Sequence, residues 1–286
     1  MSNKSGILVV LIIKTKKMTQ VTHTSNPIVQ DVINRFMTVQ KISSIFATGS
    51  MAQKGIIISG DAGTGKSHYV KQAFVETNKT EDVDMNKSVS FTAAAFYVKL
   101  FLNSNPGDVV VFDDCNLAGS NGADKKAIID MLKGAMEMTK NERVIGWERA
   151  SQNQLMKDNG VPAQFDFQGS IIWITNYSFE ELAKWAGPHW EALQSRFINV
   201  PIRLNEQEKL MYTLYLLEDI KMLEGDICET FEGGYPQDII DATIAYIRKN
   251  YKDMKNVTAR IAAKIADTMY NFPNDWQMLL ENQLNS

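Results

Sequence analysis

A complete phosphate-loop pattern is the segment of this chain whose residue types point most directly to a chemistry. Gly60, Asp61, Ala62, Gly63, Thr64, Gly65, Lys66 and Ser67 fit G-x-x-x-x-G-K-[ST] without a mismatch. The glycines let the backbone curl, so that successive N–H groups point at a β-phosphate. Lys66 would neutralise phosphate oxygens, and the Ser67 hydroxyl would ligate Mg²⁺. The pattern therefore predicts a nucleotide site that also holds Mg²⁺.

The residues on either side of the loop favour this prediction over an ordinary glycine-rich turn. Residues 55–59 form an apolar run typical of a buried strand, and residues 68–75 begin a helix with His68. A strand, the loop and a helix in this order are the context that the pattern requires. We therefore assign His68 to the nucleotide site together with residues 60–67.

A second apolar run, residues 109–112, follows Asp108 and ends in two carboxylates, Asp113 and Asp114. Beside a phosphate loop, one such carboxylate holds the Mg²⁺ shell and another orients the attacking water. We expect Asp113 to take the first role and Asp114 the second. The alternative is a strand end with two solvated acids, and the phosphate loop upstream favours the functional interpretation.

The composition indicates a cytoplasmic enzyme. The 286 residues, 44% of them hydrophobic, are enough for one large domain or two smaller ones. Cys115 and Cys228 form neither a disulfide framework nor a metal-binding spacing, which indicates a reducing compartment. The net charge of −3 excludes a protein that coats nucleic acid with its whole surface, although a local basic patch remains compatible with it.

The chain begins with a short apolar segment between lysines. Residues 6–13 are apolar but far shorter than a membrane span. Lys14, Lys16 and Lys17 stand where a signal peptide would carry small cleavage-site residues. We expect residues 1–17 to be an upstream extension with a misassigned start codon, in preference to a membrane anchor.

Apolar patterns alternate between strand and helix up to residue 204 and are helical from residue 205 onward. Alternation predicts an α/β fold with a parallel sheet, and a ligand at the carboxyl ends of its strands. We expect residues 77–87 to be a loop and residues 89–91 a short strand. We divide the chain into an extension (1–25), an α/β nucleotide-binding domain (26–204) and a helical lid domain (205–286).

The order of these motifs resembles that of AAA+ ATPases over residues 25–285. The order is the phosphate loop, Asp113-Asp114, Thr175-Asn176, residues 193–197 and residues 258–260. Within that superfamily the chain is most similar to small ATPases of tailed phages, through residues 112–115, 145–147, 165–169 and 275–276. The resemblance implies a three-layer P-loop core and a helical lid, ATP and Mg²⁺ as cofactors, and a ring homo-oligomer, most commonly a hexamer. A phage-encoded protein would act in the host cytoplasm.

The resemblance also assigns roles to residues outside the loop. Asn176 matches sensor 1, which positions the attacking water; the alternative is an asparagine that caps a turn. Arg196 matches the arginine finger, which acts on a neighbouring subunit's ATP; the alternative is a surface arginine in a salt bridge. Arg260 matches sensor 2, which touches the γ-phosphate of its own subunit. The chain departs from the family at Asp114, where most members carry Glu, and the shorter side chain reaches the water less directly.

The resemblance to phage ATPases implies DNA-related work, as a motor, helicase or loader. We expect residues 143–167 to face a central channel, where Arg143, Arg149 and Lys157 would meet phosphates and Trp147 would stack on a base. The alternative for this segment is a surface hairpin with Trp147 in the core.

A protein remodeller is the alternative function. Its pore loop would be residues 96–99, but this segment lacks the expected glycine and has the spacing of a packed helix. A nucleotide kinase is disfavoured, because the AAA+ resemblance explains both Arg196 and the helical segment.

Overall fold

The computed structural model describes the chain except for residues 1–22, 116, 118–121, 140–141, 148–153 and 285–286. Residues 1–22 of the expected N-terminal extension and Arg149 therefore lie outside the described residues, whereas residues 23–25 form a short 3-10 helix. Among the residues that are described, no helix is both long and apolar enough to cross a membrane.

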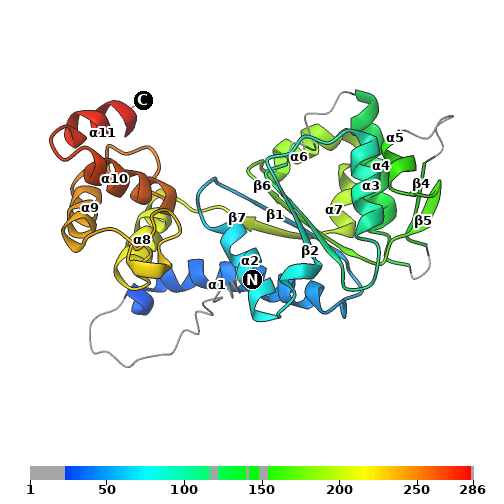
Figure 1. Cartoon of the computed structure of the whole chain (residues 1–286), viewed down its shortest axis with the longest axis horizontal. Helices are drawn as coiled ribbons and strands as arrows, with labels where there is room; N and C mark the ends of the chain where they lie inside the picture. The colour runs from blue at the N-terminus through cyan, green and yellow to red at the C-terminus, as the bar shows by residue number, and fades with distance from the viewer. Residues whose placement is uncertain (1–22, 116, 118–121, 140–141, 148–153, 285–286) are drawn as a thin grey trace, which may run out of the picture.

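The centre of the molecule is a five-stranded parallel sheet in the order β2-β3-β6-β1-β7 (Figure 1). The strands are β1 (Gly55–Gly60), β2 (Val83–Lys87), β3 (Val109–Asp113), β6 (Ser170–Thr175) and β7 (Ile198–Ile202). Strands β1, β3 and β6 are buried along their whole length, as apolar runs in the middle of a parallel sheet should be. The structure confirms the predicted α/β class.

Helices cover both faces of the sheet and make three layers (Figure 1). One face packs against α1 (Pro27–Ala47) and α2 (Lys66–Glu76). The other packs against α3 (Ala93–Leu102), α4 (Gly122–Ala135), α6 (Phe179–Ala186) and α7 (Trp190–Arg196). Successive strand residues point to opposite faces, so Ile56 and Ile58 join the first cluster while Ile57 joins the second.

The second strand lies earlier than the sequence predicted. Residues 83–87, expected to be a loop, form β2, and the strand expected at residues 89–91 is absent from the sheet. The reason is the edge position: β2 pairs only with β3, so its polar residues stay partly exposed. Val83 and Met85 alternate with these polar residues and pack against the sheet core.

A hairpin of β4 (Val144–Gly146) and β5 (Gln164–Asp166), with α5 (Gln154–Asp158) between its strands, packs outside α3 and α4 (Figure 1). Trp147 is 8% exposed and lies against Tyr97, with ring centroids 5.4 Å apart. Arg143 is 6% exposed.

The expected DNA contacts of two residues in this hairpin are therefore wrong. The Arg143 guanidinium donates to the backbone oxygens of Glu137 and Ala52, so it anchors the hairpin to the core. The Trp147 ring fills the space between the hairpin and α3 and presents no face to a base. Only Lys157 of the described basic residues in this set is exposed.

The rest of the chain is helical: α8 (Glu206–Glu218), α9 (Gln237–Asn250), α10 (Ala259–Asn271) and α11 (Trp276–Leu284). We call α8–α11 the helical region. It has its own core, which includes Leu217, Ile240 and Ile265. Tyr212 and Tyr215 of α8, however, pack into the cluster under α1. The assignment of residues 205–286 to a separate lid domain stays a prediction.

Candidate functional site

The phosphate loop connects β1 to α2, as predicted, and its glycines are required by geometry. Gly65 precedes α2 at φ 105°, a conformation that L side chains rarely adopt. Gly60 lies against β7, where a Cβ atom would stand 1.9 Å from the Ile202 oxygen. The loop therefore keeps its backbone close to the sheet and leaves the start of α2 open.

Lys66 lies inside the loop and donates to three oxygens. Its Nζ is 2.8 Å from the Gly60 oxygen, 2.7 Å from the Asp61 oxygen and 3.1 Å from Asn176 Oδ1. Burial lowers the pKa of Lys66 to about 8, although Asp113 and two other carboxylates oppose the shift. An anionic phosphate at this position would be a stronger partner for the ammonium than these neutral oxygens.

The residues predicted to ligate Mg²⁺ lie side by side. Ser67 Oγ donates to Asp113 Oδ1 at 2.8 Å, across the ends of α2 and β3. A hydroxyl and a carboxylate are hard oxygen donors, and Mg²⁺ in such sites takes few protein ligands and completes its shell with water and phosphate. The donor set therefore fits Mg²⁺. It is not a cage of the kind that holds a metal without a ligand, since no group of three or more His, Cys, Asp or Glu occurs among the described residues.

Asp114 and Asn176 meet because β3 and β6 are neighbours in a parallel sheet. Asn176 Nδ2 donates to Asp114 Oδ1 at 2.9 Å, while Asn176 Oδ1 accepts from Lys66. Both side chains are exposed at the carboxyl edge of the sheet. Asn176 thus links the cation of the phosphate loop to the carboxylate expected to orient water.

A lysine that the sequence analysis missed stands beside the metal ligands. Lys87 ends β2 and pairs in register with Asp113, and its Nζ lies 3.8 Å from Asp113 Oδ2. Apolar and polar residues alternate over residues 83–87, and this pattern would have predicted a strand that ends at Lys87.

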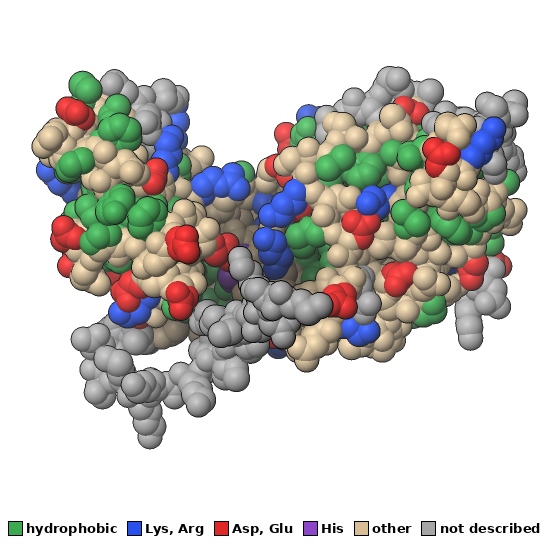
Figure 2. All heavy atoms as spheres, in the orientation of Figure 1, with side chains coloured by type: hydrophobic (Ala, Val, Ile, Leu, Met, Phe, Trp, Pro, Cys, Tyr) green, Lys and Arg blue, Asp and Glu red, His purple; other side chains and the backbone are tan. Residues whose placement is uncertain are grey.

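The helical region reaches the phosphate loop from the other side. A Cβ atom on Gly63 would lie 3.2 Å from Arg260 Cβ, so the expected sensor 2 residue is near the loop. His68 Nδ1 lies 3.1 Å from Glu229 Oε1, a residue of the helical region. Figure 2 shows a hollow between this region and the core in which Lys and Arg side chains gather. Such a surface attracts a polyanion.

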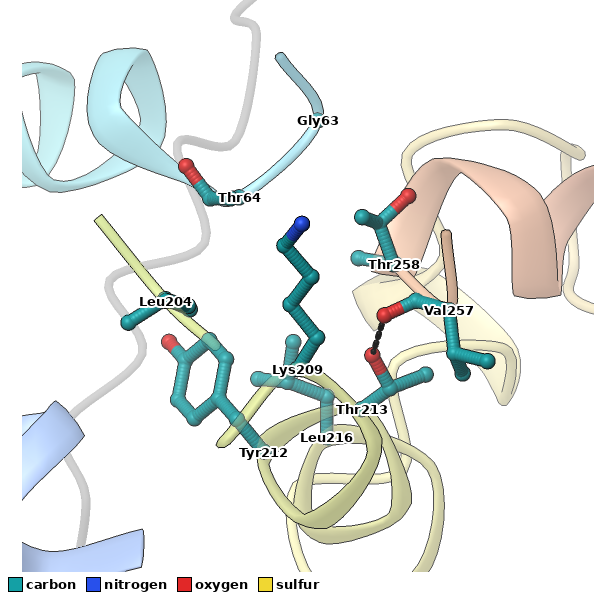
Figure 3. Close-up of a pocket in the computed structure, with 10 residues that line it drawn as sticks. Gly63, Thr64, Leu204, Lys209, Tyr212, Thr213, Leu216, Val257 and Thr258 are labelled. Atoms are coloured by element: carbon teal, nitrogen blue, oxygen red, sulfur yellow. Dashed lines mark hydrogen bonds between the residues drawn. The ribbon is translucent and has the colours of Figure 1, made fainter. Parts of the chain in front are cut away.

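Lys209 of α8 is the second residue that the sequence did not reveal. Its side chain is 8% exposed, and its Nζ lies 3.0 Å from Asp61 Oδ2 and 2.7 Å from Asn256 Oδ1. Figure 3 shows its amine between Gly63–Thr64 and Thr258. No local pattern relates Lys209 to the phosphate loop, so only the folded chain reveals the contact.

Arg196 is the one predicted site residue that does not join the others. It precedes β7, and its carbonyl accepts from Gln53, which precedes β1. Arg196 therefore stands at the amino edge of the sheet, and the phosphate loop stands at the carboxyl edge. A strand as long as β1 spans about 20 Å, so Arg196 cannot reach the phosphate site of its own chain.

The sequence and the fold are similar to those of several known proteins, although no protein-family model matches the sequence. An uncharacterised 36.7 kDa protein of the nrdC–mobD intergenic region of Enterobacteria phage T4 is 25% identical over 229 residues, which are 78% of this chain and 66% of that protein. The Thermotoga maritima RuvB Holliday junction branch migration motor has a TM-score of 0.47 at 15% identity, covering 85% of this chain and 61% of that one.

Two further structures are the replication initiator DnaA bound to AMPPCP and single-stranded DNA, and NtrX from Brucella abortus in complex with ATP. For DnaA the TM-score is 0.46 at 14% identity, over 86% of this chain and 63% of that one. For NtrX it is 0.43 at 11% identity, over 90% and 64%. The chain thus spans less than two thirds of each of these proteins. The expected fold, a three-layer parallel P-loop core followed by helices, is confirmed by the structure itself.

Proposed function

We propose that this chain is an oligomeric AAA+ ATPase that hydrolyses ATP to ADP and phosphate with Mg²⁺. The observation that supports the proposal is the pair of hydrogen-bonded sets at the carboxyl edge of the sheet: Ser67 with Asp113, and Lys66 with Asn176 and Asp114. The expected metal ligands form the first set, the cation and the expected base belong to the second, and both lie beside a loop shaped for phosphate.

Each side chain has one task in the proposed reaction. The ammonium group of Lys66 releases the backbone oxygens of Gly60 and Asp61 and donates instead to β/γ-phosphate oxygens. Asp113 and Ser67 would hold Mg²⁺, which would supply positive charge to neutralise the phosphates. Asp114 accepts a hydrogen bond from the attacking water, and Asn176 keeps the Asp114 carboxylate oriented through its amide.

The adenine ring of ATP would enter between the phosphate loop and the helical region, next to Lys209. The pocket here is lined by Leu204, Tyr212 and Val257 and has a volume of about 10 Å³. A space of this size holds about one water molecule. An adenine ring in this pocket would therefore require the helical region to move away from Gly63 and Thr64 (Figure 3).

Lys66→Ala tests the proposal directly. We expect loss of ATP binding, measured by calorimetry, and loss of phosphate release. Lys71→Ala is the matched control, because Lys71 is an exposed lysine of the same helix. ATP turnover by Lys66→Ala at the wild-type rate would refute the assignment.

The oligomer is proposed because Arg196 lies at the edge opposite its own phosphate loop. In a ring, preferably a hexamer, the amino edge of one subunit supplies Arg196 to the ATP of the next. Sedimentation with and without ATP tests the assembly. A strict monomer whose turnover per chain is independent of protein concentration would contradict it.

DNA is the partner that we propose for the ring, with a protein substrate as the alternative. Support comes from the resemblance to phage ATPases and from the exposed Lys157 of α5. With so few basic contacts, binding should be weak and only modestly salt-sensitive. ATP turnover is measured in parallel with single-stranded DNA, duplex DNA and an unfolded polypeptide. Stimulation by DNA that is lost in Lys157→Ala supports the DNA partner, and stimulation by polypeptide alone supports the remodeller.

A further inference from the structure

The guanidinium of Arg196 is already engaged within its own chain. Nη1 donates to the Ala192 oxygen at 3.0 Å, one helical turn back in α7, and Nη2 donates to Glu137 Oε2 at 2.8 Å. Nε is buried and has no hydrogen-bond partner in the part of the chain that the structure describes. The side chain is thus folded back onto α7 and α4, with both terminal nitrogens occupied.

Glu137 is itself held in place by hydrogen bonds from Met138 and Arg143. It follows α4, and its Oε1 accepts from the Met138 N–H at 2.8 Å. The Glu137 carbonyl accepts from Arg143 Nε at 2.6 Å, and Arg143 also binds the Ala52 oxygen before β1. The carboxylate therefore has a fixed position at the amino edge of the sheet.

We propose that Glu137 is a positioning residue that keeps Arg196 folded back in the isolated subunit, and that the triphosphate held by a second copy of this chain takes Arg196 from it. This inference rests on the proposed function, in which Arg196 acts on a neighbouring nucleotide. A triphosphate with its metal presents several anionic oxygens to a planar guanidinium, whereas Glu137 presents one.

The strength of the ion pair fits an exchange of this kind. The side chains of Arg196 and Glu137 are 28% and 29% exposed, so solvent screens their attraction. Such a pair holds the arginine in the free subunit but yields to a stronger anion. The ion pair should therefore raise the assembly midpoint, which is the subunit concentration at which half of the chains are assembled. Removal of Glu137 should lower it.

Glu137→Gln in the full chain tests the exchange, because it removes the charge and keeps the shape. The Asp114→Asn background is used so that bound ATP persists during the measurement. Sedimentation at a series of protein concentrations with Mg-ATP should show the assembly midpoint fall about two- to fivefold, the factor that a partly exposed ion pair can supply. Glu142→Gln, at an exposed acid of the same connection, should leave the midpoint unchanged.

Two further readouts separate positioning from a merely structural role. In an Arg196→Ala background, Glu137→Gln should have no effect on the midpoint. With Asp114 intact, Glu137→Gln should lower the protein concentration for half-maximal turnover and leave the maximal turnover within twofold. If Glu137→Gln does not fold, as judged by circular dichroism, Glu137→Asp should shift the midpoint in the same direction by less.

An unchanged or raised midpoint would overturn the inference, as would an equal shift in the Arg196→Ala background. These results leave the proposed function standing, provided that the wild-type chain assembles with ATP. A wild-type chain that neither binds ATP nor assembles would instead refute the proposed function.

Discussion

Among the described residues of the candidate site, Asp114 is a residue other than glycine that has a positive φ. Its φ of 54° lies in the left-handed region, which Asp and Asn tolerate better than most residues. Its N–H donates to the Ile174 oxygen at 3.0 Å, so the neighbouring strand fixes this conformation. The turn carries the carboxylate off the end of β3 and towards Asn176. An aspartate, where AAA+ ATPases usually carry glutamate, therefore agrees with the local backbone.

Asp114→Asn should reduce ATP turnover about a hundredfold or more, the contribution of a positioned base. Binding of ATP should persist, because asparagine tolerates the same φ and can still accept from Asn176. Turnover and calorimetric affinity are the measurements, and Asp108→Asn at the opposite end of β3 is the control. Hydrolysis at the wild-type rate would remove Asp114 from the mechanism.

Among the elements, α8 connects the two parts of the molecule. Its Tyr212 packs with the core and its Leu217 with the helical region. Lys209 on the same helix reaches both Asp61 of the phosphate loop and Asn256 before α10. A change in the position of α8 is therefore transmitted to the loop and to the segment that carries Arg260.

Lys209→Met should lower the free energy of unfolding by about 1–2 kcal/mol, since it leaves three oxygens without their charged donor. Two of these oxygens belong to the exposed carboxylates of Asp61 and Glu206, where solvent reduces the loss. The affinity for ATP should change with it, because the contact between α8 and the loop is lost. Urea denaturation and calorimetry measure the two effects. Lys264→Met, at an exposed lysine of α10, should change neither. A wild-type affinity and stability in Lys209→Met would show that the contact is dispensable.

The β4–β5 hairpin depends on Arg143 for its attachment to the core. Arg143→Ala should destabilise the protein by about 2–3 kcal/mol, because two partly buried hydrogen bonds from a charged donor are lost. Thermal unfolding measures the effect: the midpoint temperature should fall in Arg143→Ala and stay unchanged in Lys157→Ala. If Arg143→Ala lost the stimulation of ATP turnover by DNA but kept its stability, the original prediction that Arg143 contacts DNA would be supported.

At the scale of the whole molecule, the sheet separates two groups that would act on one phosphate. Arg196 stands at its amino edge and the phosphate loop at its carboxyl edge. A single copy cannot bring them together, because the strands between them are rigid. Two copies can, if the amino edge of one faces the carboxyl edge of the next.

Mixing Asp114→Asn subunits with Arg196→Ala subunits should restore activity that neither variant has alone. In a randomly mixed ring, an intact base and a neighbouring intact arginine coincide at about a quarter of the sites. ATP turnover of the equimolar mixture should therefore approach that fraction of the wild-type rate. Mixed rings without any recovered turnover would show that the sites are not shared.

The sequence by itself predicted a nucleotide site and determined the class of fold. A phosphate loop needs particular residues at fixed local spacing, so residues 60–67 identify it without a structure. Asp113 and Asn176 follow apolar runs, and the ends of parallel strands meet at one edge, so their proximity could be anticipated. The sequence also marked the change to helices near residue 205, because the apolar period changes there.

Only the tertiary structure decided which charged residues are free to meet a ligand. Arg143 and Lys157 look alike in the sequence, but Arg143 is buried under the hairpin and Lys157 is exposed. Lys209 and Glu137 acquire their partners across long stretches of chain. Burial and pairing of this kind depend on which surfaces come together in three dimensions, and no local pattern in the sequence records that.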